Sequence, residues 1–104
     1  MKGTWKLRRG TPRLTSILFA GPKRTVKLGR FDFGIDHDGS WFGWYTYNFV
    51  PPRLLRSVER ALGIDRDDFQ NGMEVMLDDV PTREGVEPKL NAIAARLNEL
   101  EVAP

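Results

Sequence analysis

Residues 25–49 read TVKLGRFDFGIDHDGSWFGWYTYNF, and this stretch decides the fold. Two runs of alternating polarity, Thr25–Ile35 and residues 40–49, flank the turn sequence Asp36-His37-Asp38-Gly39. Alternation of apolar and polar residues is typical of a half-buried β-strand, and Asp-Gly between two such runs marks a hairpin. The stretch therefore predicts two antiparallel strands joined by a tight turn.

The first of these strands changes its alternation at Gly29. The parity of the apolar positions shifts there, from Val26 and Leu28 to Phe31, Phe33 and Ile35. A shift of one residue sends every later side chain to the opposite face of a sheet, so an uncorrected strand would expose one apolar set. One extra residue in a β-bulge restores the pattern, and we therefore predict a bulge at this glycine.

The second strand, over about residues 40–49, contains six aromatic side chains. Alternation divides these side chains between two faces, with Trp41, Tyr45, Tyr47 and Phe49 on one face and Phe42 and Trp44 on the other. One face must belong to the core. The sequence leaves open whether Phe42 and Trp44 are exposed or buried beneath a second layer.

The remaining elements are predicted from the periodicity of apolar residues and from the Gly and Pro residues that interrupt it. Two earlier strands are predicted over about residues 4–9 and over Leu14–Ala20, with a turn at Gly10-Thr11-Pro12 between them. Val50-Pro51-Pro52 ends the sheet. One amphipathic helix is predicted over residues 53–62, with Gly63 as its cap, and another from Pro88 to about Leu100. The predicted fold is α+β, an antiparallel β-meander of about four strands followed by two main amphipathic helices packed on the sheet.

Residues 65–85 are less regular. Asp65-Arg66-Asp67-Asp68 predicts a capped short helical turn that ends at Gly72, with Asp65 as its N-cap. Residues 73–77 fit either a last strand or a helix, because periodicity over so few residues does not decide. Residues 81–85 are predicted to be a loop.

The chain of 104 residues fits a single domain, residues 1–104. Residues 1–50 form a basic, aromatic β part, and residues 51–104 form an acidic, mainly helical part. Residues 1–30 contain nine Lys or Arg and no Asp or Glu, whereas residues 61–104 contain ten acids and four bases. This asymmetry indicates an anion-binding face, or else two halves that neutralise each other when they pack.

Several classes of function are disfavoured by composition. The chain contains no Cys and one His, which excludes thiolate chemistry and sites built from several His ligands. It contains no phosphate-binding glycine loop and no nucleophile or metalloprotease motif. We therefore expect no enzymatic activity, no catalytic residues, no cofactor and no metal. An apolar run long enough for a membrane or a signal peptide is not present, so a cytoplasmic protein is expected.

Two acidic clusters have local explanations. Asp36-His37-Asp38 resembles a metal or acid–base site, but adjacent strand residues point to opposite faces and Asp is common in turns. The acids after Asp65 resemble a calcium loop, but an EF-hand requires Gly at the sixth position, which is Gln70 here. We expect the first cluster to be a turn and the second to be a helix N-terminus.

The combination of basic and aromatic side chains on the predicted strands is the feature of the sequence that indicates a function, namely binding. The first hypothesis is a non-catalytic protein-interaction module or inhibitor, of the phage-accessory type, or a subunit of a larger assembly, since Trp, Tyr and Arg dominate binding hot spots. Its partner could be an acidic protein or another copy of the chain. The alternative is a nucleic-acid-binding protein that uses the same surface for phosphate contacts and base stacking. The candidate binding residues are Lys6, Arg8, Lys23, Arg24, Lys27, Arg30, Phe42, Trp44, Arg53, Arg56 and Arg60.

Overall fold

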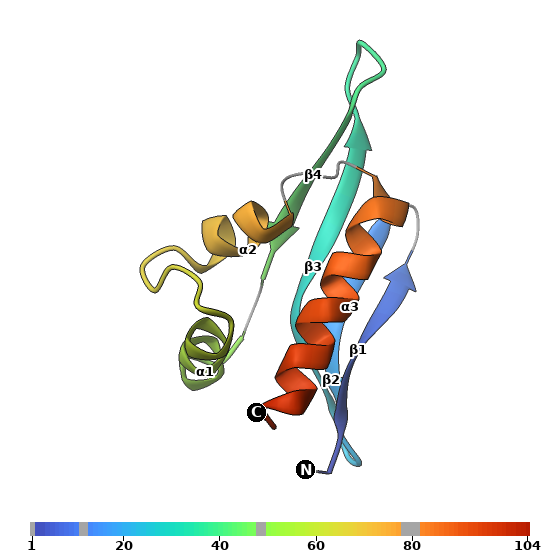
Figure 1. Ribbon diagram of the computed structural model, residues 1–104. Coiled ribbons are helices and arrows are strands. Elements are labelled where there is room, and N and C mark those ends of the chain that lie inside the picture. Colours follow the sequence, from blue (N-terminus) through green and yellow to red (C-terminus); the bar gives the residue numbers. More distant parts are fainter. Residues whose placement is uncertain (1, 11–12, 48–49, 78–81) are drawn as a thin grey trace.

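The computed structural model of the protein describes residues 2–10, 13–47, 50–77 and 82–104. Its strands are β1 (Thr4–Gly10), β2 (Leu14–Ala20), β3 (Thr25–Ile35) and β4 (Trp41–Thr46), and its helices are α1 (Pro52–Leu62), α2 (Phe69–Leu77) and α3 (Arg83–Glu99). The strands form one antiparallel sheet in the order β1-β2-β3-β4, as predicted (Figure 1).

The helices pack on one face of this sheet. Helix α3 lies across β1 and β2, α2 contacts β4, and α1 packs against α3 (Figure 1). The core between the layers is built from the apolar stripe of each helix and the inner face of the sheet. The inner face contributes Trp5, Ile17, Phe19, Leu28, Phe31, Phe33 and Tyr45. Burial of such large side chains is the main source of stability in a domain of this size.

The predicted bulge lies at Gly29. Ile17 of β2 is paired with Gly29, but the next residue, Leu18, is paired with Lys27, so that Leu28 is the extra residue. Leu28 is fully buried in the core. The bulge therefore keeps the apolar residues before and after it on the inner face, and it places Lys27 and Arg30 together on the outer face.

Both the backbone conformation at position 29 and the side chains around it require a glycine. Its φ of 153° is a conformation that other residues rarely adopt, and a Cβ at this position would collide with the phenol of Tyr45. The Tyr45 hydroxyl donates a hydrogen bond of 2.5 Å to the carbonyl oxygen of Leu28. Burial raises the pKa of Tyr45 above its usual range, and nearby Tyr47 adds to this shift. The inner face of β4 is thus fitted to the bulge in β3.

Both edges of the sheet are partly covered by helix side chains. The Asn98 amide of α3 accepts a hydrogen bond from the Trp5 backbone N–H (2.7 Å) and donates one to its carbonyl oxygen (3.0 Å). At the other edge, the Glu74 carboxylate of α2 accepts a hydrogen bond of 3.0 Å from the Tyr45 backbone N–H. These contacts occupy backbone groups that would otherwise be free to pair with another strand.

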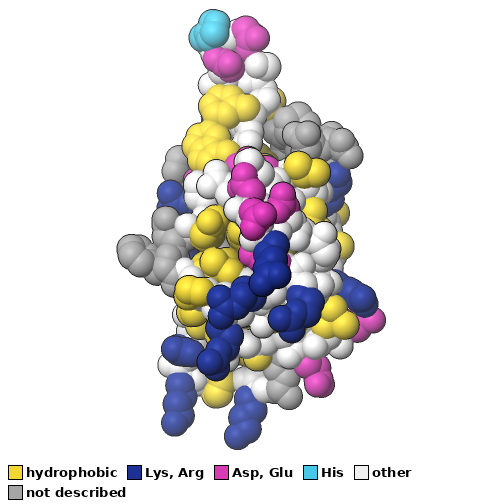
Figure 2. Space-filling view, turned by 90° about the vertical axis from the view of Figure 1, so that its left-hand side faces the viewer, with side chains coloured by type: hydrophobic (Ala, Val, Ile, Leu, Met, Phe, Trp, Pro, Cys, Tyr) yellow, Lys and Arg dark blue, Asp and Glu magenta, His cyan; other side chains and the backbone are white. Residues whose placement is uncertain are grey.

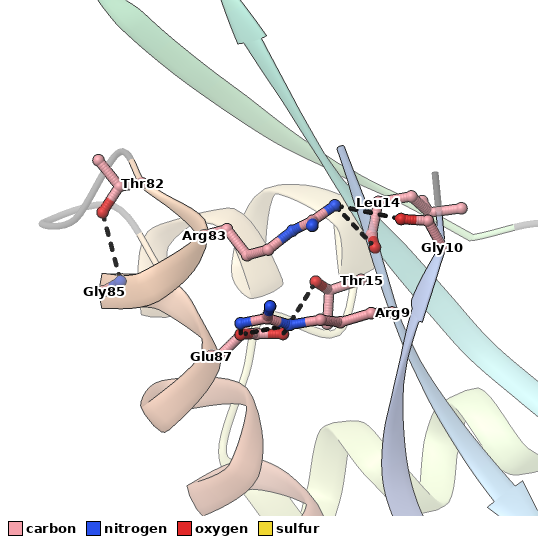
Figure 3. Close-up of polar contacts among 8 residues, drawn as sticks. All are labelled: Arg9, Gly10, Leu14, Thr15, Thr82, Arg83, Gly85 and Glu87. Atoms are coloured by element: carbon pink, nitrogen blue, oxygen red, sulfur yellow. Dashed lines mark hydrogen bonds and ion pairs between the residues drawn. The ribbon is translucent and has the colours of Figure 1, made fainter. Parts of the chain in front are cut away.

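Polar contacts fix the first turns of α3 to β1 and β2 (Figure 3). The Glu87 carboxylate forms a bidentate ion pair with Arg9, and it accepts a hydrogen bond of 3.3 Å from the Thr15 hydroxyl. Arg83 donates to the carbonyl oxygens of Gly10 and Leu14 at 3.2 and 3.3 Å. The hydrogen bond from Arg9 is the main cause that lowers the pKa of Glu87.

The predictions for residues 65–77 were partly wrong. Residues 69–77 form one helix, α2, and Asp68 caps it, because its carboxylate accepts a hydrogen bond of 3.0 Å from the Asn71 N–H. Asp65 instead accepts from the Asp67 N–H in a local turn. Gly72 lies inside the helix, where a Cβ would be 3.1 Å from the Cβ of Ile64. This glycine therefore permits close packing and does not end the helix.

The prediction for the start of the last helix was also wrong. Helix α3 begins at Arg83, with the hydroxyl of Thr82 accepting from the Gly85 N–H, so Pro88 lies inside it. The missing N–H of Pro88 leaves the carbonyl of Glu84 without its helical partner, which is tolerable because Glu84 is exposed. Helix α1 and its cap at Gly63 agree with the prediction.

Strand β4 is shorter than predicted, since it ends at Thr46. Phe49 lies outside the described residues, as do Thr11 and Pro12 of the predicted first turn. At the other end, the hairpin formed by β3 and β4 extends beyond the helices (Figure 1). Trp41 therefore remains 42% exposed although its parity places it on the inner face.

Candidate functional site

The outer face of the sheet, which we call the open face, is not covered by any described helix. Strand alternation and the observed register place the following residues on it: Lys6, Arg8, Ser16, Leu18, Lys27, Arg30, Asp32, Phe42, Trp44 and Thr46. Six of the eleven candidate residues from the sequence are in this set. The question left open by the sequence is thereby answered, because Phe42 and Trp44 are 41% and 40% exposed.

Cations of β1 and β3 lie in two neighbouring rows of the open face, on either side of β2. In one row Leu18 of β2 is paired with Lys6 on one side and Lys27 on the other. In the next row Ser16 is paired with Arg8 and Arg30 in the same way. All four cations are exposed, whereas Leu18 and Ser16 between them are buried. The rows form a positively charged strip across the sheet.

The aromatic pair continues the face toward the hairpin. The rings of Phe42 and Trp44 stack with their centroids 5.2 Å apart and their planes inclined by 15°. Phe42 is paired with Gly34 of β3, and its ring lies where a side chain on Gly34 would be. Because Gly34 leaves this space free, Phe42 can lie flat on the sheet and support Trp44. The pair forms a preformed apolar platform with exposed ring surface.

Asp32 separates the platform from the cations. It is paired with Trp44 on β4, and its carboxylate accepts a hydrogen bond of 3.1 Å from Arg30 Nε. It is the only acid among the described residues of the open face. Asp32 was not among the candidates from the sequence. It is two residues from Arg30 on the same strand, so alternation alone already placed the two side chains on one face of the sheet.

The remaining candidates lie elsewhere. Lys23 and Arg24 are exposed in the β2–β3 turn, where the Arg24 carbonyl accepts a hydrogen bond of 2.9 Å from the Gly21 N–H. This turn adjoins the end of the sheet that carries Lys27. The arginines of α1 (Arg53, Arg56 and Arg60) belong to the helical layer and are not part of the open face.

The α1 arginines contribute to a second basic region. Arg56 and Arg60 line a cavity of about 260 Å³ together with Glu59, Ile64 and Arg66. Figure 2, which views the side of α1 and α2, shows Lys and Arg side chains gathered below acidic ones. Glu59 lines the same cavity as Arg56, Arg60 and Arg66, so the positive charge of these arginines is partly compensated. The sequence spacing had identified the α1 arginines but not Arg66.

The hairpin tip behaves as a local turn. The Asp38 carboxylate accepts hydrogen bonds from the Ser40 hydroxyl (2.5 Å) and backbone N–H (2.9 Å), which lower its pKa. His37 is exposed and its Nδ1 lies 2.7 Å from Asp36 Oδ1. Within the described part of the chain, no three His, Cys, Asp or Glu side chains gather as a metal site would require. Figure 2 shows the tip standing clear of the molecule.

A larger cavity lies between the helices. It has a volume of about 550 Å³ and is lined by apolar side chains of all three helices, with Lys89 and Arg96 of α3 also contributing. None of the candidate binding residues from the sequence lines this cavity.

In the described ranges, no helix is both long enough and apolar enough to cross a bilayer. Searches against protein-family models, curated proteins and solved structures find no significant match to this chain.

Proposed function

We propose that this protein binds single-stranded nucleic acid on the open face of its sheet and that it does so without catalysis. The observation that carries the proposal is that the Phe42–Trp44 platform and the exposed cations of β1 and β3 lie on the same face of the sheet, with Asp32 between them. Proteins that hold single strands combine exposed aromatic rings, on which bases stack, with Lys and Arg side chains that follow the phosphates. We place this activity in the cytoplasm as part of the same proposal.

The form of the face favours a single strand over a duplex. Stacking on Trp44 requires an unpaired base, because the rings of a duplex are already stacked on each other. The described part of the open face is a sheet surface, without a helix that could enter the major groove. The phosphates of the strand that leads away from the stacked base would then lie over the strip formed by Lys6, Arg8, Lys27 and Arg30.

The test is fluorescence anisotropy with labelled single strands of about ten nucleotides, as RNA and DNA, and with the matching duplex. We expect the single strand to bind more tightly, and log K to fall linearly with log salt concentration. Replacement of Arg8 or Lys27 by Ala should each reduce this salt slope by about 0.7, the value for one phosphate contact on a single strand.

Arg53→Ala is the matched control, because it removes the same charge from the helical layer. Its salt slope and affinity should equal those of the wild type. The proposal fails if the single strand does not bind at about 50 mM salt. It also fails if Arg53→Ala weakens binding as much as the open-face variants do.

A protein-interaction module is the second candidate function, and the exposed apolar part of the hairpin supports it. Ile35 and Trp41 are 43% and 42% exposed on the face opposite to Trp44, and the Arg13 guanidinium lies 5.0 Å from the centroid of the Trp41 ring. Such a surface suits a protein partner. Binding through it should persist at high salt and should be lost in Trp41→Ala, whereas nucleic-acid binding should be lost in Trp44→Ala.

A further inference from the structure

Asp32 is out of place on a surface that binds only phosphates. It lies next to Arg30 and opposite Trp44, and its side chain is 23% exposed to solvent. A carboxylate repels a phosphate backbone and weakens the field of the neighbouring cations. If the open face recognised the backbone alone, an acid at this position would only reduce affinity.

We propose that Asp32 selects the base that stacks on the platform, favouring bases with an amino group and disfavouring uracil and thymine. This inference rests on the proposed function. A base lying on the Trp44 ring would have an edge directed toward the next strand, where Asp32 is the register partner of Trp44. Directly opposed residues on one face of antiparallel strands have Cβ atoms about 5 Å apart, so the carboxylate is within reach of that edge.

The chemistry of the two pyrimidines explains the selection. An ionised carboxylate can only accept hydrogen bonds. Cytosine offers its N4 amino group, and Asp and Glu are the side chains that accept from it. In uracil the ring N3–H lies between two carbonyl oxygens, and a carboxylate that approaches it meets repulsion from at least one of them. Adenine and guanine also carry amino groups and should be accepted.

Arg30 completes the recognition of cytosine. Its Nε donates to Asp32, which holds the guanidinium beside the carboxylate and leaves its other N–H groups free to donate. The two side chains therefore present an acceptor next to a donor. Cytosine presents the complementary order, with the N4 amino donor next to the N3 acceptor. Uracil presents the reverse order at the same positions, with the O4 acceptor next to the N3–H donor, so it does not match.

The experiment compares labelled oligocytidine and oligouridine of equal length by anisotropy at neutral pH. These two have rings of the same size, so that their stacking is similar and the base edge is the main difference. We expect the wild type to prefer oligocytidine by about fivefold or more, which corresponds to the lower end of the discrimination that such a contact provides. Asp32→Ala should bind oligouridine more tightly than the wild type and oligocytidine no more tightly, so that the ratio approaches one.

Two further variants make the result specific. Asp32→Asn keeps the size of the side chain but can both donate and accept, so its preference should be intermediate. Asp67→Ala removes an exposed acid near α2, and it should leave the ratio unchanged although the net charge changes equally. A wild type that binds both oligomers equally, or an Asp32→Ala variant that keeps the preference, overturns this inference and leaves the proposed function intact. A wild type that binds neither oligomer overturns both.

Discussion

The phenol ring of Tyr45 occupies the space that a side chain on Gly29 would fill, and its hydroxyl donates a hydrogen bond to the backbone at the same bulge. This contact lies on the buried face of the sheet, but it has consequences for the open face. The bulge is what turns Lys27 and Arg30 to the same side, although they are three residues apart in the strand. The packing of Tyr45 therefore helps to position the cations of the candidate site.

Replacement of Gly29 by Ala should destabilise the protein strongly. The new methyl group would clash with Tyr45 and would also disfavour the positive φ, so we expect a loss of about 3 kcal/mol or more. Urea denaturation followed by circular dichroism measures this loss. Gly63→Ala is the control, since Gly63 has a φ of 68° and open space around it, and it should cost about 1 kcal/mol. Equal losses would show that Tyr45 does not restrict this position.

Tyr45→Phe should cost about 1–3 kcal/mol, because it leaves the buried carbonyl of Leu28 without its hydrogen bond. It should also change the response to alkali. Burial raises the pKa of Tyr45 in the folded protein, so above about pH 10 the phenol ionises in the unfolded chain first and stability falls as pH rises. The variant should lose stability less steeply between neutral and alkaline pH than the wild type. Parallel curves for the two proteins would contradict this account.

Glu87→Gln should weaken the attachment of α3 to β1 in a pH-dependent way. The hydrogen bond from Arg9 lowers the pKa of Glu87 in the folded state, so this carboxylate contributes stability above its unfolded pKa of about 4.3. That contribution disappears as pH falls through the lower folded value. Thermal denaturation should therefore show the wild type to be more stable near neutral pH, and the two proteins should converge in acid. A constant difference at all pH values would argue against the ion pair as the cause.

Trp44→Ala should reduce the affinity for a single-stranded oligonucleotide by about tenfold, since stacking of one base on an aromatic side chain contributes about 1–3 kcal/mol. Trp41→Ala is a closely matched control. Trp41 lies on the same strand with nearly the same exposure, but on the opposite face. Its loss should leave nucleic-acid affinity unchanged in the same anisotropy assay. If both variants lose affinity equally, the open face is not the binding surface.

The sequence predicted the strands well because their signals are local. Turn residues, alternation and the parity change at Gly29 each act within a few residues, and the four strands and the bulge were found where they were expected, although β4 ends earlier than predicted. The end of α1 was predicted for the same reason, since Gly63 adopts the left-handed conformation of a helix cap.

The helices after residue 63 were predicted less well because tertiary contacts override the local signals there. Gly72 resembled the end of a helix, but the structure uses it for close packing against Ile64. Pro88 resembled a first residue, but contacts of Arg83 and Glu87 with β1 and β2 accompany the start of α3 five residues earlier.

The sequence by itself determined that Phe42 and Trp44 share one face of a strand and that nine cations precede that strand. It did not determine which face would be covered, because alternation is symmetrical with respect to the two sides of a sheet. Only the packing of α2 against the Tyr45 side of β4 decided that this pair is exposed. The same tertiary arrangement separated the α1 arginines from the sheet cations and placed Asp32 beside Trp44, because residues far apart in sequence become neighbours only through packing and strand pairing.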